Sequence, residues 1–324
     1  MIVTVTGASG YLGRAVAAEL VAAGHEVRTL QRRPSTVAGA TDVLGSIGDA
    51  AVVARALDGA EGVVHLAAKV SLAGDPAEFR TVNVEGTRRL LDEAGRAGAS
   101  RFVQVSSPSV AHAGASLAGV GAEPASPADA RGEYARTKAE AELLALARDS
   151  AAMHVVAVRP HLVWGPGDTQ LVGRIVDRAR RGRLPLLDGG RALIDSTYID
   201  NAATGVAAAL HQAPSAHARA FVITNGEPRP VGELLAGICL AAGVRPPSWS
   251  IPAGVARAAG SLIERAWALR PGADEPPMTR FLAEQLSTAH WFDQRETRAA
   301  LEWSPAVSID EGLRRLASHA AAAR

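Results

Sequence analysis

The sequence predicts an α/β fold in which a doubly wound parallel sheet carries a smaller C-terminal lobe. A short apolar strand at residues 2–6 runs into a glycine-rich turn and then into a helix rich in Ala, Leu and Val, from Arg14 to Ala23. Strand and helix patterns then alternate without a break to about residue 165, which is typical of a parallel sheet covered by helices. After Gly165-Pro166-Gly167 the alternation breaks down. We therefore expect two domains, residues 1–165 and residues 166–324.

The first turn reads Gly7-Ala8-Ser9-Gly10-Tyr11-Leu12-Gly13. Gly7 permits the tight bend, Gly10 lets a pyrophosphate approach the backbone, and Gly13 lets helix and strand pack closely. The pyrophosphate would lie on the free N–H groups and the positive dipole end of the helix. A second strand follows at βαβ distance, which favours a nucleotide-binding turn over an ordinary strand-to-helix turn. We predict a Rossmann-type domain with cofactor contacts at Gly7, Ser9, Gly10, Tyr11 and Leu12.

The second strand, Glu26 to Gln31, ends in a basic segment that bears on cofactor choice. An acidic residue at this place would accept hydrogen bonds from the adenosine ribose of NAD, whereas arginine attracts the 2′-phosphate of NADP. The chain has Gln31 here, followed by Arg32 and Arg33. The segment favours NADP(H), with NAD(H) as the open alternative, and a solvated basic loop is the other interpretation.

The next strands complete the predicted sheet. Residues 41–48 carry a third strand, 49–57 a helix, 62–66 an apolar fourth strand, 76–97 a helix through Asn83, and Arg101 to Val105 a fifth strand. Ligands bind such sheets at the carboxyl ends of the strands, where small residues leave room for a cofactor. We expect cofactor contacts at Leu66, Ala67, Ala68, Lys69 and Val105.

Tyr134 and Lys138 lie four residues apart at the start of a helical run, so they share one face. A free tyrosine has a pKa near 10 and is a poor acid or base at neutral pH. A neighbouring ammonium stabilises the phenolate and makes proton transfer useful. The spacing alone is common by chance, but here it follows a nucleotide fold and the serine-rich turn Ser106-Ser107-Pro108-Ser109. The pair therefore predicts acid–base catalysis.

Composition excludes several classes of function. Hydrophobic residues make up 48% and charged residues 21% of the 324 residues, and the formal net charge is +1, so nothing indicates nucleic-acid binding. Cys239 is the only cysteine, which excludes an internal disulfide and a multi-cysteine metal site. The chain opens on a core strand and has no apolar stretch of about 18 residues, so we expect a soluble cytoplasmic protein.

Two further features allow more than one interpretation. Residues 251–269 form an amphipathic helix that would cover an apolar substrate, touch a membrane, or pack on its own core, and we expect the last. His161 and His290 would be acid–base residues or metal ligands, but no third ligand follows at suitable spacing. We expect structural histidines and no metal site.

These motifs resemble those of the extended short-chain dehydrogenase/reductase family, part of the NAD-dependent epimerase/dehydratase superfamily. The resemblance covers the whole chain: it includes the glycine turn, the triad Ser107, Tyr134 and Lys138, and the segments 159–168 and 197–201. Within the family, the chain is most similar to the branch of 3-beta-hydroxysteroid dehydrogenases and bacterial 2-alkyl-3-ketoalkanoate reductases. The residues that suggest this branch are Ser107-Pro108-Ser109-Val110, Arg159-Pro160-His161 and the segment 286–293.

The resemblance implies roles for particular residues. Tyr134 would deliver a proton to the carbonyl oxygen, Ser107 would hold that oxygen, with Ser106 as its rival, and Lys138 would bind the nicotinamide ribose and tune Tyr134. The resemblance also implies cofactor contacts at Asn83, Pro160, His161, Leu162 and Val163. Residues 166–324 would form the substrate-binding lobe, with segments of about 192–225 returning to the sheet. A homodimer through the helices of Asn83 and Tyr134 is usual in the family.

The leading function is therefore an NADPH-dependent carbonyl reductase, or the reverse alcohol dehydrogenase. It would act at a β-keto or 3-hydroxy position of a small apolar substrate, steroid-like or long-chain. The alternative is a nucleotide-sugar epimerase or dehydratase with tightly bound NAD, which would favour an acidic residue in place of Gln31. A silent nucleotide sensor is a third interpretation, but such proteins have usually lost the tyrosine or the lysine.

Overall fold

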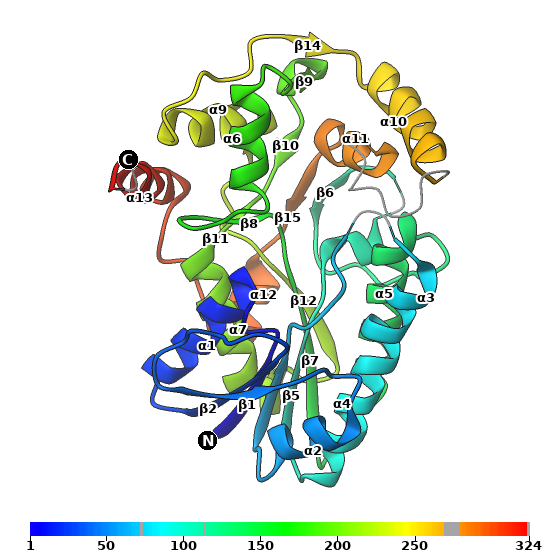
Figure 1. Ribbon diagram of the computed structural model, residues 1–324, viewed down its shortest axis with the longest axis vertical. Coiled ribbons are helices and arrows are strands. Elements are labelled where there is room, and N and C mark those ends of the chain that lie inside the picture. The colour runs from blue at the N-terminus through cyan, green and yellow to red at the C-terminus, as the bar shows by residue number, and fades with distance from the viewer. Residues whose placement is uncertain (72–73, 113, 269–278, 323–324) are drawn as a thin grey trace.

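The computed structural model describes residues 1–71, 74–112, 114–268 and 279–322 (Figure 1). Its centre is a seven-stranded parallel sheet in the order β12-β7-β5-β4-β1-β2-β3. The strands are β1 Ile2–Thr6, β2 Glu26–Gln31, β3 Ala40–Leu44, β4 Gly62–His65, β5 Arg101–Val105, β7 His154–Pro160 and β12 Arg219–Ile223. The predicted doubly wound fold is confirmed, and β2 and β5 have the predicted bounds.

Helices cover both faces of this sheet, as Figure 1 shows. On one side lie α1 (Tyr11–Ala22) and α7 (Ile199–His211), and on the other α2 (Ala50–Leu57), α4 (Gly86–Arg96) and α5 (Gly132–Leu146). Alternate residues of the central strands point to the two helix layers: Val3 and Val5 pack with α1 and α7, whereas Val63 and Phe102 pack with α2 and α4. Burial of these apolar side chains on both faces is the main force that holds the domain together.

The predicted helix over residues 76–97 is three segments. A short α3 (Pro76–Phe79) leads into a π-helical turn, η1 (Arg80–Glu85), and then into α4. A π-turn accommodates one residue more than an α-turn. Asn83 lies inside it with 2% of its surface exposed, and its side chain bonds to the backbone of Lys69 at 2.7 Å. The periodicity of the sequence did not indicate this bulge, because its cause is a contact with a distant loop.

The C-terminal lobe lies beyond the carboxyl ends of the main strands (Figure 1). Its larger helices are α6 (Val172–Arg180), α9 (Val231–Ala241), α10 (Ala253–Ala268), α11 (Arg280–Ser287) and α13 (Ile309–Ala322). A short η3 (Asp188–Gly190) also belongs to this lobe, whereas η2 (Pro108–Ala111) follows β5, and α8 (Ala213–Ala216) and α12 (Arg295–Leu301) pack against the main sheet. A second sheet has the order β13-β10-β15-β6, from Arg229–Pro230, Leu193–Ile194, His290–Phe292 and Leu117–Val120. Two further sheets have two strands each: β11 (Thr197–Tyr198) with β8 (Val163–Trp164), and β14 (Ser250–Ile251) with β9 (Leu186–Leu187).

The sequence pattern of residues 194–199 predicts one strand, and this prediction is wrong. The segment forms β10 and β11, which belong to different sheets, and α7 already begins at Ile199. The chain turns between them because Asp195 is buried and accepts a hydrogen bond from Thr224 Oγ1 at 2.8 Å. Of the predicted returning segments, β12 joins the main sheet and α7 covers it, whereas β10 does not join it. The boundary at residue 165 stays a prediction.

Helix α10 packs against α11 through small residues. Ala256 is buried there, and a Cβ on Gly260 would come within 2.7 Å of the backbone of Thr279 and Arg280. Val255 and Leu262 of the amphipathic pattern are 58% and 66% exposed, so these apolar residues do not form the face that packs on α11. The predicted end of this helix at Leu269 and the prolines at 271–277 lie outside the described residues. Among the described helices, none combines the length and apolar character that crossing a membrane requires.

Candidate active site

Ser107, Tyr134 and Lys138 come together at the carboxyl end of β5. Ser107 caps the short helix η2, accepting from Ser109 N at 3.3 Å and from Ser109 Oγ at 2.9 Å. It is hydrogen-bonded to the phenol of Tyr134: burial raises the pKa of Tyr134, and this bond lowers it. The structure thus places Ser107, rather than the rival Ser106, beside Tyr134. The tyrosine is held as a neutral proton donor.

Lys138 lies one turn further along α5, and 4% of its surface is exposed. Its Nζ donates to Val105 O at 2.6 Å, which brings it to the end of β5. Burial lowers the pKa of Lys138 to about 8, and the Glu142 carboxylate, one turn further on, raises it against that trend. The lysine therefore keeps much of its charge at neutral pH, close to Tyr134.

Glu142 itself belongs to a buried ion pair that sequence reasoning missed. Arg159 and Glu142 are 2% and 1% exposed, and the guanidinium binds both carboxylate oxygens, with Nε at 2.9 Å from Oε2. Arg159 Nη1 also donates to Glu123 O at 2.6 Å. The pair ties α5 to β7 and to the long segment between Ser107 and Tyr134. The motif containing Arg159 was recognised, but its partner lies 17 residues away without a spacing signature.

His65 forms a second buried link that the sequence did not indicate. Thr87 Oγ1 donates its single proton to Asn83 O at 2.6 Å, so it must accept from His65 Nε2 at 2.9 Å. His65 Nδ1 then accepts from Thr6 Oγ1 at 2.7 Å. Burial, together with the charge of Lys138, lowers the pKa of His65 to about 3. A neutral imidazole therefore connects the nucleotide turn to the helix of Asn83.

Asn83 extends this connection to the catalytic helix. Its Oδ1 accepts from Lys69 N at 2.7 Å, and its Nδ2 donates to Lys69 O at 3.2 Å and to Thr137 Oγ1 at 3.0 Å. Lys69 also forms an ion pair with Glu78. Asn83 thus fixes the segment after β4 against α5.

The residues after β4 are placed by the first strand. Thr6 Oγ1 accepts from the amides of Leu66 and Ala67, both at 3.1 Å. A Cβ on Gly7 would lie 2.9 Å from Ala67 N, so only glycine allows this approach. Ala68 continues along the same segment.

The turn before α1 fits a dinucleotide. Gly13 packs so closely that a Cβ would lie 2.3 Å from Gly7 O, and Gly10 is exposed at the helix start. The first intrahelical bond is Arg14 N to Gly10 O, no side chain caps the helix, and its first turn carries no acidic residue. Its leading amides are therefore available to a pyrophosphate. Ser9 and Leu12 are partly buried in this turn.

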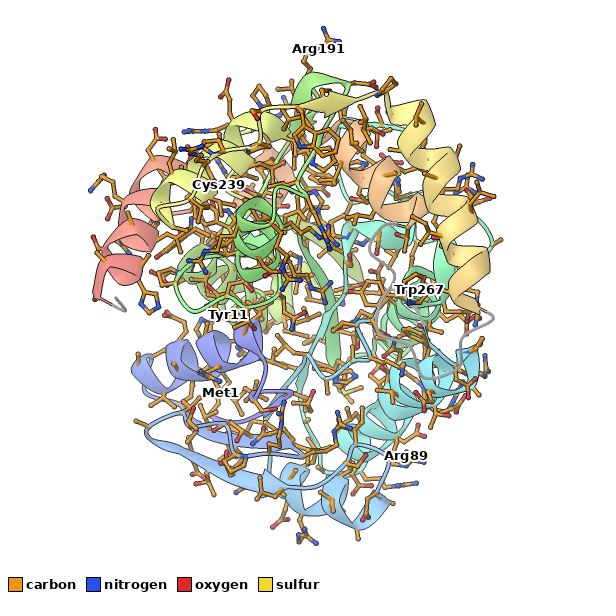
Figure 2. All side chains as sticks on the ribbon, turned by 45° about the horizontal axis from the view of Figure 1, so that its top comes forward. Met1, Tyr11, Arg89, Arg191, Cys239 and Trp267 are labelled. Carbon is orange, nitrogen blue, oxygen red and sulfur yellow. The ribbon has the colours of Figure 1, made fainter. Side chains whose placement is uncertain are left out.

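Tyr11, labelled in Figure 2, is at the start of α1 where that helix faces the C-terminal lobe. Its hydroxyl donates to Pro166 O at 3.3 Å, and burial raises its pKa. The phenol hydroxyl thus joins the start of α1 to the segment after β8, and the cofactor contact of Tyr11 stays a prediction.

A carboxylate from the neighbouring strand β3 lies beside the end of β2, where the sequence of β2 has no acidic residue. Asp42 on β3 accepts from Gln31 Nε2 at 2.9 Å and from Ser35 N at 3.1 Å. Burial raises the pKa of Asp42, but hydrogen bonds from Thr29, Ser35 and Gln31 leave it below its ordinary value. Gln31 is buried, whereas Arg32 and Arg33 are exposed. The carboxylate is engaged by neighbouring donors, and the two arginines face solvent.

The segment 160–163, predicted to contact the cofactor, begins at the last residue of β7 and is hydrogen-bonded to β12 and β11. His161 N donates to Ile223 O at 3.1 Å, and Thr197 Oγ1 donates to His161 O at 2.6 Å. Pro160 pairs with Ile223, Val163 pairs with Thr197, and Leu162 has a φ of 43°, a strained conformation for leucine. The segment is therefore held rigidly at the end of β7.

The His161 ring is buried at the entrance to the C-terminal lobe. It lies edge-on to Phe292 at 5.3 Å and to His290 at 5.9 Å between centroids. Burial lowers the pKa values of His161 and His290 to about 3, so both rings are neutral. His161 Nε2 has no hydrogen-bond partner within the described residues. Such a buried, unpaired nitrogen suits a polar group of a bound cofactor or substrate.

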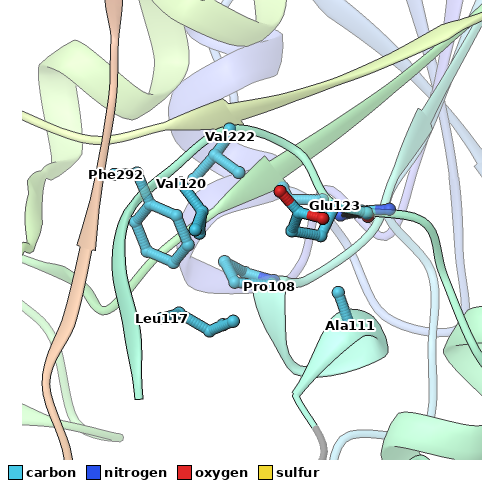
Figure 3. A pocket seen from close by; sticks show the side chains of 9 residues that line it. Pro108, Ala111, Leu117, Val120, Glu123, Val222 and Phe292 are labelled. Carbon is cyan, nitrogen blue, oxygen red and sulfur yellow. Dashed lines mark hydrogen bonds between the residues drawn. The ribbon is translucent and has the colours of Figure 1, made fainter. Parts of the chain in front are cut away.

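A small pocket adjoins the Ser107 turn, and Figure 3 shows the side chains around it. Its lining is mostly apolar: Pro108, Ala111, Leu117, Val120, Gly121, Glu123, Arg159, Val222 and Phe292. The side chains fill the space between them, so the pocket is an apolar surface beside the Ser107 turn rather than an open cavity.

Comparison with known proteins agrees with this geometry. The model of the NAD dependent epimerase/dehydratase family matches residues 3–224. The 2-alkyl-3-oxoalkanoate reductase of Stenotrophomonas maltophilia is 39% identical over 99% of this chain and 100% of its own length. A ketoreductase of Stigmatella aurantiaca, named for a farnesyl quinoline oxide, is 31% identical over 95% of this chain and 93% of its own. A 3 beta-hydroxysteroid dehydrogenase/Delta 5-->4-isomerase of Mycobacterium tuberculosis is 32% identical over 96% of this chain and 88% of its own length.

Solved structures share the whole fold. A short-chain dehydrogenase/reductase superfamily protein of Agrobacterium tumefaciens with bound NAD superposes with a TM-score of 0.77 at 25% identity, over 100% of this chain and 98% of that chain. The UDP-glucuronic acid 4-epimerase of Bacillus cereus with NAD has a TM-score of 0.76 at 19% identity, over 100% of this chain and 99% of that chain. At this identity, the likeness shows the fold alone. The family match, the relatives and the Ser107–Tyr134–Lys138 geometry agree: the chain belongs to the NAD dependent epimerase/dehydratase family, the extended short-chain dehydrogenases/reductases.

Proposed function

We propose that this NAD(P)-dependent oxidoreductase uses NADPH to reduce the β-keto group of an apolar substrate, long-chain or steroid-like, or runs the reverse oxidation. The observation that carries the proposal is the contact between Ser107 and a neutral Tyr134, with Lys138 one turn away. The relatives support the substrate class, since they are named for oxoalkanoates, a farnesyl quinoline oxide and steroids.

The residues divide the proton chemistry between them. Tyr134, whose pKa burial raises, holds its proton until the carbonyl oxygen gains charge, and then donates it. Ser107 donates a hydrogen bond to that oxygen, and the Lys138 ammonium stabilises the resulting phenolate. The nicotinamide cofactor, when bound, supplies the hydride.

The cofactor would be held along the carboxyl edge of the sheet. The leading amides of α1 would bind the pyrophosphate, Lys138 would bind the nicotinamide ribose, and the 160–163 segment would flank the ring. Arg32 and Arg33, which are exposed, would pair with the 2′-phosphate. Asp42 supports the loop that leads to them through its bond to Ser35.

The apolar lining of the pocket beside the Ser107 turn supports the proposal of an apolar substrate. Leu117, Val120 and Phe292 adjoin the Ser107 turn, so an alkyl group next to the carbonyl would contact them. Burial of alkyl groups there contributes roughly 0.8 kcal/mol per CH₂.

The deciding experiment is titration of the apo-protein with NADPH and NADH, followed by addition of a 2-alkyl-3-oxo acid, a long-chain 3-ketoester and a 3-keto steroid. We expect tighter NADPH binding and its oxidation by one of these ketones, and no oxidation with Tyr134→Phe. Failure of every ketone would overturn the proposed substrate class. Tight NAD that co-purifies and does not exchange would instead support the epimerase or dehydratase function.

We also propose a homodimer through α4 and α5, as in the family. Leu143 on the outer face of α5 is 44% exposed, next to a row of ion pairs that Arg136 makes with Glu133 and Glu140. Light scattering should give twice the chain mass, and Leu143→Glu should give a monomer. A monomeric wild type would contradict this.

A further inference from the structure

Three titratable side chains meet at the edge of the main sheet opposite the active site. Asp149 follows the C-terminal end of α5, His154 is the first residue of β7, and His217 precedes β12. The strands β7 and β12 are parallel neighbours, so their amino ends bring these residues together. Ser107 and the 160–163 segment follow the carboxyl ends, at the other edge.

The cluster is compact. One ligand atom from each of the three residues lies within 4.8 Å of the others. His217 Nδ1 is 2.8 Å from Asp149 Oδ2, and the two imidazole rings lie 4.5 Å apart at 43°. Asp149 Oδ1 accepts from Val155 N at 2.8 Å, which fixes the carboxylate. The three side chains are only partly buried, so ions from solvent reach them.

A second observation is an unpaired nitrogen on His154. His154 Nδ1 is buried and has no hydrogen-bond partner within the described residues. A buried nitrogen without a partner costs free energy, and most such atoms in proteins are satisfied. Asp149 and His217 bond to each other, and neither forms a hydrogen bond with this nitrogen.

We propose that Asp149, His154 and His217 bind a divalent transition-metal cation such as Zn²⁺, with solvent as the fourth ligand. Two imidazoles and one carboxylate suit Zn²⁺, Co²⁺ or Ni²⁺ rather than the all-oxygen preference of Mg²⁺ or Ca²⁺. The cation takes the place of the Nδ1 proton of a neutral His217, which moves to Nε2 of the same ring, and accepts a lone pair from His154.

The geometry requires one small movement. Bonds of about 2.0 Å in a tetrahedral site place ligand atoms about 3.3 Å apart. His217 Nδ1 and Asp149 Oδ2 are closer than that, at 2.8 Å, so binding requires the side chain of His217, which is 39% exposed, to turn from Asp149 toward the shared ion. His154 and Asp149 are held by β7 and by Val155, and provide the fixed side of the site.

The bound ion would tie the end of α5 to β7 and β12. Because it lies about 12 Å or more along α5 from Lys138, at 1.5 Å per residue, it would stabilise the domain without entering the reaction. The inference is independent of the proposed substrate: it predicts a thermal shift whether or not the enzyme reduces any ketone.

The test uses the full chain without a polyhistidine tag. Calorimetric titration with ZnCl₂ should give one strong site, and Zn²⁺ should raise Tm. His154→Phe, which keeps a ring but no nitrogen, and His217→Gln, which keeps a hydrogen-bond donor to Asp149, should each weaken binding at least tenfold. His211→Gln serves as the matched control, because it alters a histidine pair outside the cluster, His25 and His211, whose Nε2 atoms lie 2.8 Å apart, and it should bind like the wild type.

Two outcomes would overturn the site: no Zn²⁺ binding by the wild type, or equal binding by the wild type and both cluster variants. Should either variant fail to fold, Co²⁺ titration of the wild type decides. A visible absorption band of a tetrahedral or five-coordinate nitrogen–oxygen site, removed by Zn²⁺ in a ratio of one ion per chain, supports the proposal. A spectrum no different from aqueous Co²⁺ rejects it.

Discussion

Replacing Glu142 by glutamine removes the charge from one side of the buried Arg159–Glu142 pair while keeping its shape. Arg159 is 2% exposed, so its guanidinium would remain out of water without a counter-charge. Breaking such a pair costs about 3–5 kcal/mol, and the amide oxygen of glutamine still accepts one bond, which puts the expectation near 3 kcal/mol. Against a total stability of about 5–15 kcal/mol, that loss is large.

The assay is urea unfolding of the wild type, Glu142→Gln, Arg159→Met and the double variant Glu142→Leu/Arg159→Met. Each single change leaves one partner unpaired, whereas the double variant replaces the pair with apolar side chains of similar volume, so it should lose less than the sum of the single changes. Glu140→Gln is the matched control on the same helix, since Glu140 is only partly buried and pairs with Arg136 and Arg80. A loss below about 1 kcal/mol for Glu142→Gln, the range of an exposed pair, would refute the reasoning.

Glu142→Gln should also change the pH dependence of activity. The Glu142 carboxylate raises the pKa of Lys138 against the effect of burial, so its removal lowers that pKa below about 8. Activity that needs the ammonium is lost as pH rises through this pKa, and the alkaline limb of kcat/KM should therefore move to lower pH. Glu140→Gln should leave the limb in place, and an equal shift in both variants would contradict the role given to Glu142.

Three further predictions follow from the site and the core. Tyr134→Phe should lower kcat about 10²–10⁴-fold, because it removes the proton donor, while nucleotide binding measured by fluorescence is retained; near-normal turnover would remove Tyr134 from the mechanism. Arg32→Ala/Arg33→Ala should weaken NADPH much more than NADH in the same titration, and equal losses would dismiss the proposed phosphate contact. Burial lowers the pKa values of His65, His161 and His290 to about 3, so the unfolded chain binds protons that the fold excludes between that pH and about 6.5. Their stabilising contribution is complete above pH 6.5 and is lost as pH falls, with a slope of up to about 4 kcal/mol per pH unit for three protons, measured by urea unfolding across that window; a flat profile between pH 5 and 6.5 would contradict it.

The sequence predicted the sheet well because its strands are local patterns. β-branched and apolar residues between turn segments indicate a strand, and β2 and β5 have the bounds that this pattern predicts. The Tyr134–Lys138 pair was visible for a similar reason, since four residues on one helix fix its geometry.

What sequence reasoning missed depends on contacts between distant segments. The neutral state of His65 follows from Thr87 and Thr6, 22 and 59 residues away, and no spacing rule joins them. The π-turn at Asn83 exists because its side chain reaches the segment after β4. The break between β10 and β11 depends on Asp195 finding Thr224. In each case a buried polar group, rather than hydrophobic periodicity, decides the local structure.

The strand β6 has a consequence for how the protein is made. Residues 117–120 lie between Ser107 and Tyr134 in the chain, yet they pair in parallel with β15, and Leu117 N donates to Ala289 O at 2.8 Å. During synthesis from the N-terminus, this pairing waits until residues beyond 290 have left the ribosome. The segment that joins the two catalytic residues is thus anchored among the last steps of folding. A shortened chain that ends before β15 would leave β6 without this partner, as an unpaired edge prone to aggregation.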